Sequence, residues 1–358
     1  MKQTVLVTGA SGFLGQHIIR LLQEKDPTVG EIRCLDLKPY YNNLDHLTPK
    51  AMKVIKGDIR NVQTVNDSVA GVDCIIHCAE LMDRRVFANE AELKSVNVNG
   101  TENLLEAAKK HNVRYFIYVS TIDVVCGPDP IYYAAENTVM IPKSHCFDAF
   151  AKSKIEAEKL VQSANEELCS NGVDRLQTVI LRPTSLYGEE DTSNITAFLR
   201  TAKECDGCLP RIDNTFIRIQ ITYAGNAAWA CIKAKDKLQI DQSIGGEIFF
   251  ITDDTPIMDP FDFVEPILKA CGLRLSKRAY PYWLLNILLT AFVYVVKLIN
   301  PIIPIPVSST MNPGTLQYVS NIYFFNRNKA ILRLDYEPLY DSEESQKNSI
   351  EYYKSLNL

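Results

Sequence analysis

Residues 5–15 read VLVTGASGFLG, a short β-branched apolar run followed by three regularly spaced glycines. The pattern of residues 17–25 is amphipathic, so the order along the chain is strand, glycine turn and helix. Gly9 permits a tight turn, Gly12 lets the backbone approach a pyrophosphate, and Gly15 allows the helix to pack closely on the strand. The N–H groups at the start of that helix then face the phosphates. The stretch therefore predicts a dinucleotide-binding turn.

Asp36 stands at the end of the next predicted strand, residues 32–35, and 21 residues past Gly15. A carboxylate at this position accepts hydrogen bonds from the adenosine ribose 2′-OH and repels a 2′-phosphate. The position therefore favours NAD over NADP as the cofactor, although Lys38 softens this preference. The alternative interpretation is that Asp36 only caps a turn.

Apolar strand-like runs and helical patterns continue to alternate along the first half of the chain. Such alternation requires right-handed crossovers and a parallel sheet with helices on both faces. We therefore predict an α/β fold with a Rossmann-like, doubly wound parallel sheet. The further predicted strands are residues 52–55, 74–78, 115–119 and 178–181, and the further predicted helices are residues 90–110 and 150–162.

The alternation ends after Pro183, where strands and helices become irregular. A smaller lobe that closes over the open ends of the strands would produce this change. We predict an NAD-binding Rossmann domain over residues 1–182 and a C-terminal substrate-binding lobe over residues 183–358.

The composition is that of an ordinary folded protein, because 46% of the 358 residues are hydrophobic and 23% are charged. The formal net charge of −5 argues against a nucleic-acid-binding protein. Ten cysteines are scattered along the chain, which is typical of a reducing compartment. Cys205 and Cys208 form a lone C-x-x-C without the four ligands of a closed zinc site, so no metal site is predicted. The opening MKQTVLVTGASG shows no signal peptide, and we expect an intracellular protein.

A strand-end hydroxyl and a helical Tyr-x-x-x-Lys together form a hydride-transfer site, because the phenol exchanges a proton and the lysine lowers its pKa. Thr121 follows the predicted strand 115–119 and supplies the hydroxyl. Lys154 supplies the lysine, and position 150 lies one helical turn before it. That position holds Phe150, whose ring has no proton to give.

With these motifs the chain resembles the extended short-chain dehydrogenase/reductase superfamily and, more narrowly, the 3β-hydroxysteroid dehydrogenase/Δ5–Δ4 isomerase family. The resemblance covers nearly the whole chain. Its first half is also similar to nucleotide-sugar epimerases, whereas FIYVSTIDV, GNAAWA, DDTP and a late apolar segment favour a steroid. It rests on VLVTGASGFLGQHIIRLL, EIRCLDL, GDIR, VDCIIHCA, VNVNGTENLLEAA, FIYVSTIDV, AKSKIEAEKLV, LRPTSLYGEED, TYAGNAAWA, FFITDDTP, RLDYEPLYDSEES and the apolar stretch near residues 283–307.

The resemblance implies a set of residues around an NAD cofactor, which contact its pyrophosphate, adenosine and carboxamide or, like Asn97, support the active-site helix. These cofactor-binding residues are Gly9, Ser11, Gly12, Phe13, Leu14, Gly15, Asp36, Asp58, Ile59, Cys78, Ala79, Asn97, Lys154 and Pro183.

The resemblance also implies five catalytic positions, Thr121, Phe150, Lys154, Asp253 and Asp254. Thr121 would be the substrate-binding hydroxyl, and Phe150 occupies the place of the catalytic tyrosine. Asp253 and Asp254 match a motif associated with the isomerase step, in which a carboxylate would move a proton between steroid carbons. The alternative for this pair is a loop cap.

Phe150 leaves three interpretations open: an engineered Tyr→Phe change, a natural and weakened enzyme that uses Thr121 or a water as proton relay, and a pseudoenzyme. The first functional hypothesis is NAD-dependent oxidation of a 3β-hydroxy-Δ5 steroid to the 3-oxo steroid, with or without Δ5–Δ4 isomerisation. The second is a catalytically silent protein that binds NAD and a sterol. The third is an epimerase or dehydratase that acts on a nucleotide sugar.

Residues 283–299 read WLLNILLTAFVYVVKLI, which is near the lower length limit for a membrane-spanning helix. Basic residues and aromatic residues precede the run, as is typical of an interfacial anchor. We predict that residues 283–307 associate with an intracellular membrane, of the endoplasmic reticulum or alternatively of mitochondria, from which a sterol would arrive. The alternatives are a buried helix of the substrate lobe and a homodimer interface.

Overall fold

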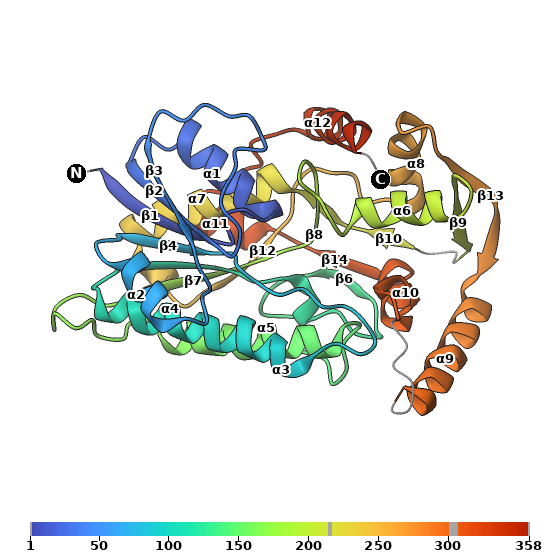
Figure 1. The fold of residues 1–358 in the computed structure, drawn as a ribbon, viewed down its shortest axis with the longest axis horizontal. Helices are drawn as coiled ribbons and strands as arrows, with labels where there is room; N and C mark the ends of the chain where they lie inside the picture. The colour runs from blue at the N-terminus through green and yellow to red at the C-terminus, as the bar shows by residue number, and fades with distance from the viewer. Residues whose placement is uncertain (1, 214–216, 301–306, 357–358) are drawn as a thin grey trace.

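The computed structural model describes residues 2–213, 217–300 and 307–356, and its main element is a seven-stranded parallel sheet (Figure 1). The strand order is β12-β7-β5-β4-β1-β2-β3. This sheet confirms the predicted α/β, doubly wound fold. The strands are β1 (Gln3–Thr8), β2 (Val29–Asp36), β3 (Ala51–Lys56), β4 (Cys74–His77), β5 (Tyr115–Val119), β7 (Gln177–Pro183) and β12 (Ile248–Ile251).

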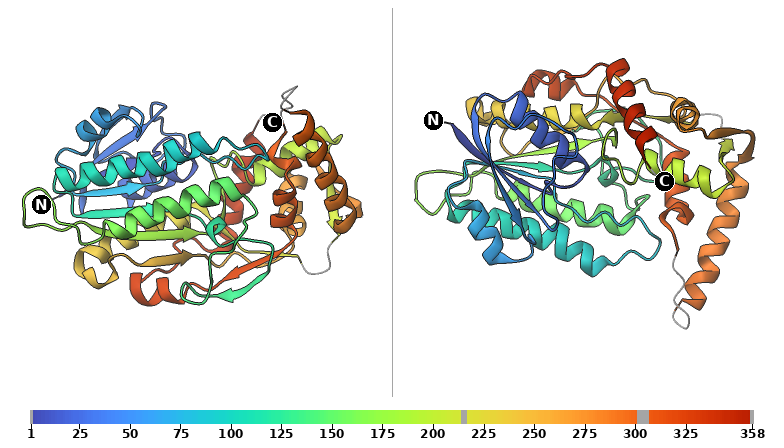
Figure 2. Two further views of the ribbon diagram at one scale, coloured as in Figure 1. Left: turned by 90° about the horizontal axis from the view of Figure 1, so that it is seen from below. Right: turned by 45° about the horizontal axis from the view of Figure 1, so that its top comes forward.

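Helices cover both faces of this sheet. Successive residues of a strand point to opposite sides, and here both sides carry apolar side chains that must be buried. Val5 and Val7 of β1 belong to the apolar core shared with α1, α7 and α11, whereas Leu6 packs with α2, α4 and α5. Two views of the molecule show the sheet between its two helical layers (Figure 2). These helices are α1 (Phe13–Glu24), α2 (Val62–Val69), α4 (Gly100–Lys110), α5 (Asp148–Ser163), α7 (Ala224–Ile240) and α11 (Asn328–Leu334).

The strand order reverses between β1 and β4, which are neighbours in the sheet although β2 and β3 lie between them in the sequence. In open parallel sheets, ligands bind beyond the carboxyl ends of the strands at such a reversal. The glycine turn after β1 and the segment after β4 therefore meet at the expected binding position.

The predicted helix over residues 90–110 is divided into α3 (Glu90–Leu93), a π-helical segment over Lys94–Asn99, and α4. The wider segment carries Asn97, whose side chain binds Leu81 twice, accepting from its N–H at 2.7 Å and donating to its carbonyl oxygen at 3.0 Å. Departures of this kind from a regular α-helix are frequent at functional sites.

A smaller group of elements lies at the carboxyl side of the sheet (Figure 1). Its core contains Tyr187, Leu199 and Phe261. The domain boundary predicted at residue 182 stays a prediction. Two elements from beyond it belong to the main sheet region, because β12 is a strand of the sheet and α7 covers one of its faces. The remaining elements are β6 (Ile131–Ala134), β8 (Ser185–Tyr187), α6 (Ile195–Glu204), β9 (Cys208–Asp213), β10 (Arg218–Ile219), β11 (Ile221–Tyr223), α8 (Pro260–Ala270), β13 (Arg274–Pro281), α9 (Tyr282–Ile299), α10 (Pro313–Val319), β14 (Ile322–Phe325), α12 (Ser342–Ser355), and short 3-10 turns at Ile122–Val124, Gln242–Ile244 and Ser309–Met311.

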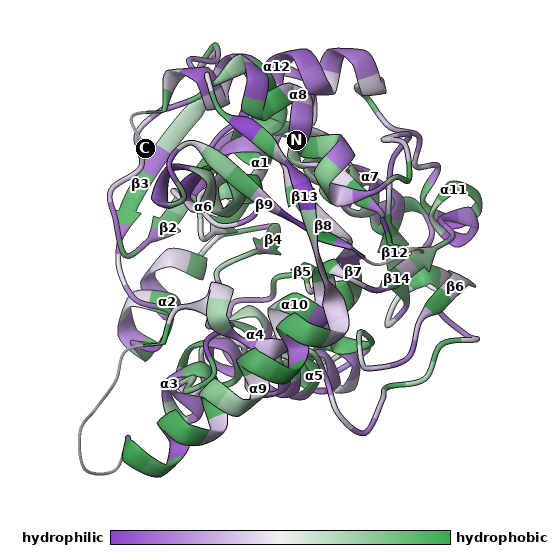
Figure 3. Cartoon of the chain, turned by 90° about the vertical axis from the view of Figure 1, so that its right-hand side faces the viewer, coloured by the Kyte–Doolittle hydropathy of each residue, from purple (hydrophilic) through white to green (hydrophobic). Residues whose placement is uncertain are grey.

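Helix α9 projects from the body of the molecule and contacts β13 and α10 (Figures 1 and 2). Most of its residues are apolar (Figure 3), and only Val293 and Val296 among them are buried. By length and composition it is long and apolar enough to cross a membrane. Residues 301–306 of the predicted membrane segment lie outside the described residues.

A buried ion pair fixes α5 against the sheet. The Arg182 guanidinium on β7 donates to both carboxylate oxygens of Glu158 on α5, at 2.8 and 2.6 Å. Both side chains are buried. Glu158 lies one turn after Lys154, so the pair sets the position of α5 relative to the strand ends.

We expect Arg182→Met to lower the free energy of unfolding by about 3 to 5 kcal/mol, because it leaves the Glu158 carboxylate buried without a partner. Denaturant unfolding measures this loss. The double variant Arg182→Met/Glu158→Leu is the control, and it should recover most of the stability because both charges are gone. A loss below about 1 kcal/mol, the value of an exposed pair, would contradict the argument.

Candidate cofactor and substrate site

The glycine turn has no room for side chains at two positions. Gly9 has a φ of +69°, and a Cβ there would lie 2.7 Å from the backbone nitrogen of Ala79. A Cβ at Gly15 would collide with the carbonyl oxygen of Gly9. The turn therefore packs directly against the segment after β4 and leaves the start of α1 open, which fits a dinucleotide phosphate group.

A cleft of about 330 Å³ lies at the carboxyl ends of β1, β2, β4 and β5. It brings together thirteen of the residues predicted from the sequence. Ser11, Asn97 and Lys154 are next to it through hydrogen bonds or an ion pair to lining residues or their neighbours. The predicted residues that line it are Gly9, Gly12, Phe13, Leu14, Gly15, Asp36, Asp58, Ile59, Cys78, Ala79, Thr121, Phe150 and Pro183.

Two carboxylates at the end of the cleft next to β2 and β3 are held by local hydrogen bonds. Asp36 accepts from the backbone N–H of Ser11 and of Lys38, each at 3.0 Å. Asp58 binds the guanidinium of Arg60, and this hydrogen bonding lowers the pKa of the Asp58 carboxyl below its usual value. Asp36 therefore both orders the glycine turn and faces the cleft.

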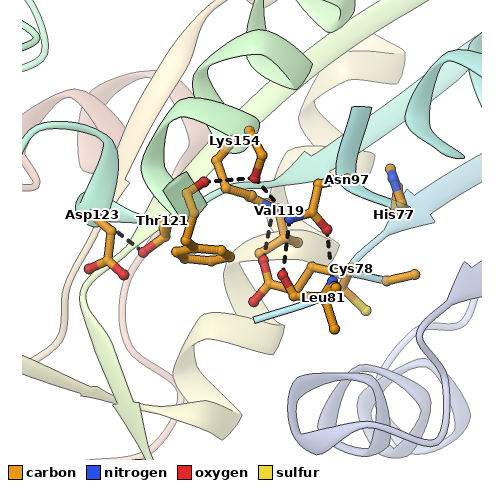
Figure 4. Close-up of polar contacts among 12 residues, drawn as sticks. His77, Cys78, Leu81, Asn97, Val119, Thr121, Asp123 and Lys154 are labelled. Atoms are coloured by element: carbon orange, nitrogen blue, oxygen red, sulfur yellow. Dashed lines mark hydrogen bonds and ion pairs between the residues drawn. The ribbon is translucent and has the colours of Figure 1, made fainter. Parts of the chain in front are cut away.

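Lys154 lies fully buried behind the cleft, at the end of β5 (Figure 4). Its Nζ donates to the carbonyl oxygen of Val119 at 2.9 Å, forms an ion pair with Glu80 at 2.9 Å, and lies 4.6 Å from the centre of the Tyr118 ring. Burial by itself lowers the pKa of Lys154, but Glu80 and Tyr118 outweigh it and raise the pKa above its usual value. Lys154 therefore stays protonated over the working pH range.

Phe150 lies one turn before Lys154 and lines the cleft, as the spacing predicts. Its side chain is 1% exposed and packs in an apolar cluster with Leu93 and Ile122. The backbone around it is held by a hydrogen-bonded chain, because Asn97 donates to the Ser153 hydroxyl at 3.0 Å and this hydroxyl donates to the Phe150 carbonyl at 2.7 Å. The position predicted for a catalytic tyrosine therefore holds a buried phenyl ring at the wall of the cleft.

Thr121 begins a short turn just after β5 (Figure 4). Its hydroxyl oxygen accepts from the backbone N–H of Asp123 at 3.2 Å. The buried Asp123 carboxylate binds the Arg84 guanidinium at 2.6 Å, and the guanidinium stacks 4.7 Å from the centre of the Phe147 ring. This arrangement places a fixed cation at the edge of the cleft.

The predicted isomerase carboxylates lie elsewhere. Asp253 is buried and accepts from the backbone N–H of Tyr223, from the Asn226 side chain and from the backbone N–H of Thr255. Burial raises the pKa of Asp253 above its usual value. Asp254 is largely exposed and pairs with Arg327. Neither residue is among those that line the cleft or the neighbouring cavity, and their contacts are those of a loop cap.

A second cavity of about 560 Å³ lies beside the cleft and is mainly apolar. One of its walls is α9. It reaches the cleft, because Arg84, Ser185, Leu186, Ser193 and Asn194 line both spaces. Its apolar lining includes Ile122, Phe147, Phe198, Ile221, Leu285, Leu289, Phe292, Leu316 and Tyr318.

Three residues of this site, Glu80, Arg84 and Asn194, were not predicted from the sequence. Glu80 could have been found, since it directly follows Cys78 and Ala79 at a strand end. Arg84 and Asn194 lie in irregular segments, where no periodicity indicates which way a side chain points.

A model of the 3-beta hydroxysteroid dehydrogenase/isomerase family matches residues 6–282. The chain belongs to this family. The sequence is 33% identical to human 3 beta-hydroxysteroid dehydrogenase type 7 over 358 residues, which cover 98% of this chain and 95% of that protein. The mouse protein of the same name is 32% identical over 361 residues, with the same coverage. The predicted family is therefore confirmed.

Solved structures share the fold of this family member at lower sequence identity. A dTDP-glucose 4,6-dehydratase from Streptomyces venezuelae with bound NAD has a TM-score of 0.71 and 19% identity, and covers 98% of this chain and 97% of its own. A short-chain dehydrogenase/reductase superfamily protein from Agrobacterium tumefaciens with bound NAD has a TM-score of 0.66 and 18% identity, over 98% and 96% of the two chains. These likenesses establish the fold alone.

Proposed function

We propose that this protein oxidises a 3β-hydroxy-Δ5 steroid to the 3-oxo steroid with NAD as the cofactor. The observation that carries the proposal is the apolar cavity, which shares lining residues with the dinucleotide cleft. A rigid, apolar substrate with one reactive hydroxyl fits this pairing, because its body fills the cavity while its polar end reaches the cleft. The membership of the chain in the steroid dehydrogenase family supports the same reading.

The residues of the cleft fit NAD. Gly9, Gly12 and Gly15 would hold the pyrophosphate, and Asp36 would accept from the adenosine ribose, which disfavours a 2′-phosphate. The nicotinamide ring supplies a hydride acceptor when the cofactor is bound. Thr121, which lines the same cleft as Phe150, would orient the substrate hydroxyl.

Two alternatives make different use of the same site. A silent NAD- and sterol-binding protein is favoured by Phe150, which has no exchangeable proton. A nucleotide-sugar epimerase or dehydratase would need polar groups around the sugar and second phosphate, whereas the cavity beside the cleft is mainly apolar. Δ5–Δ4 isomerisation would require a carboxylate near the steroid, whereas Asp253 and Asp254, the positions that the family resemblance implies, line neither the cleft nor the cavity.

The experiment measures reduction of NAD and of NADP by the purified chain with 3β-hydroxy-Δ5 steroids. In parallel it follows conversion of UDP-glucose and dTDP-glucose by chromatography of the products, because an epimerase or dehydratase regenerates its NAD and forms no net NADH. We expect NADH to form with a steroid, at a higher kcat/KM than NADPH. Conversion of a sugar nucleotide without steroid oxidation would support the third hypothesis. Steroid and NAD binding without turnover, in the Phe150 chain and in Phe150→Tyr, would support the silent protein.

We also propose that α9 attaches the protein to an intracellular membrane, that of the endoplasmic reticulum or alternatively that of mitochondria. The helix is 18 residues long, has a mean hydropathy of 1.9 and is mostly exposed. The exposed Arg274 and Arg278 on the preceding strand suit lipid headgroups, and the exposed Trp283 suits the interface.

We expect the triple variant Ile287→Lys/Val295→Lys/Leu298→Lys to move the protein from the membrane pellet to the soluble fraction, because three exposed apolar side chains become charged. Cell fractionation with organelle markers measures the change.

The matched control places three lysines at exposed apolar positions outside α9, Val173, Ile240 and Leu332, and should stay in the pellet. Retention of the α9 variant in the pellet would contradict the proposal. Loss of a dimer in sizing experiments, with no change in fractionation, would show instead that α9 is a homodimer interface.

A further inference from the structure

The cleft has a lysine and a hydroxyl in place but no phenol at position 150, so a proton acceptor must come from another group. Among the described residues that line the cleft, the carboxylates are Asp36, Asp58 and Glu80. Asp36 accepts backbone hydrogen bonds at the glycine turn, and Asp58 binds Arg60. Both lie at the end of the cleft next to β2 and β3. Glu80 is the carboxylate that lies beside Lys154.

Glu80 lies just after β4. It directly follows Cys78 and Ala79, which pack against Gly9 of the glycine turn. Its Oε2 lies 2.9 Å from the Lys154 Nζ, and its side chain is 30% exposed. Within the described residues, Lys154 is the one cation at ion-pair distance from it. Its second carboxylate oxygen is therefore available to a ligand in the cleft, which Thr121 and Phe150 also line.

We propose that Glu80 is the proton acceptor of the oxidation, in the role that a tyrosine at position 150 would fill. This inference rests on the proposed function. The O–H bond of the substrate breaks and its proton passes to the Glu80 carboxylate. The electrons of that bond form the C=O double bond, and NAD, when bound, would supply the acceptor for the hydride that leaves C3. The products are the 3-oxo steroid, NADH and a protonated Glu80, which returns its proton to solvent.

A carboxylate is basic enough for this role because the substrate oxygen becomes strongly acidic as the hydride departs. The charges that face Glu80 are those of Lys154 on α5 and Arg84 after β4, and the neutral Tyr118 and Cys78 lie nearby. Lys154 holds the carboxylate in position. The partial exposure of Glu80 gives the proton a way out to water.

The test combines Glu80→Gln with Phe150→Tyr. Glu80→Gln keeps the shape and removes the base, so we expect kcat of the Phe150 chain to fall by about 10² to 10³-fold. The affinity for NAD, measured by quenching of protein fluorescence without substrate, should change little. In the Phe150→Tyr background the same Gln substitution should cost much less, because the phenol takes the proton. The matched control is Glu156→Gln, an exposed glutamate of α5 that pairs with Lys94, and it should match the parent chain.

Other outcomes overturn the inference. An equal loss in both backgrounds would show that Glu80 only positions the site through Lys154. Tighter NAD binding with an unchanged kcat would show that Glu80 only competes with the cofactor for Lys154. An unchanged kcat and affinity would indicate Thr121 or a water as the relay. If Phe150→Tyr itself oxidises no steroid, the proposed function fails first, and the inference fails with it.

Discussion

Phe150→Tyr is expected to raise kcat for steroid oxidation by up to about 10²-fold, the lower end of what general acid–base catalysis contributes, because Glu80 already accepts the proton in the Phe150 chain. The position already faces the cleft one turn before the protonated Lys154, and the Asn97–Ser153 chain holds its backbone. A phenol there gains a proton to exchange and a nearby cation that lowers its pKa. Steady-state NADH formation measures the change.

Phe324→Tyr is the control, since it adds the same hydroxyl at β14, away from the cleft. Equal and substantial rates in Phe150→Tyr and the Phe150 chain would contradict the prediction, and would mean that another group already moves the proton at full efficiency. Binding of NAD and steroid without turnover in either chain would favour the silent protein.

The parallel sheet could be predicted because its strands are buried on both faces and read as short apolar runs between helical patterns. Residues 115–119 coincide with β5, and the predicted strand over residues 74–78 differs from β4 by one residue. The last strand, β12, could not be assigned to the sheet from its sequence. Only tertiary packing decides that this segment, 65 residues after β7 ends, pairs beside β7.

The residues of the candidate site also fall into those that the sequence predicts and those that only the folded chain brings together. The glycine turn, Asp36 and the spacing of positions 150 and 154 are local patterns with a direct physical meaning, and the structure brings them into one cleft. The Glu80–Lys154 pair joins two segments 74 residues apart, so no sequence period predicts it. The apolar cavity likewise requires α6, α9 and α10 to meet, which no single motif encodes.

Lys154→Met is expected to remove most of the activity gained by Phe150→Tyr, lowering kcat by about 10²-fold or more, because the phenol then keeps a high pKa. In the Phe150 chain the same change should also lower kcat, since Glu80 loses the cation that holds it. Measurement of kcat in both backgrounds, together with NAD affinity and a thermal melt, separates these effects.

The thermal melt is the decisive control, because it separates a catalytic role of this buried lysine from a role in folding. Replacing a buried ammonium by an apolar side chain of similar length removes its desolvation cost, and such changes are often neutral for stability. The abandoned partner, Glu80, is 30% exposed and regains water, unlike the buried Glu158 left by Arg182→Met. Activity should therefore fall while the melting temperature stays nearly constant. A large drop in melting temperature with Lys154→Met would show that the ion pair holds β4 and α5 together, and that its position in the cleft is structural.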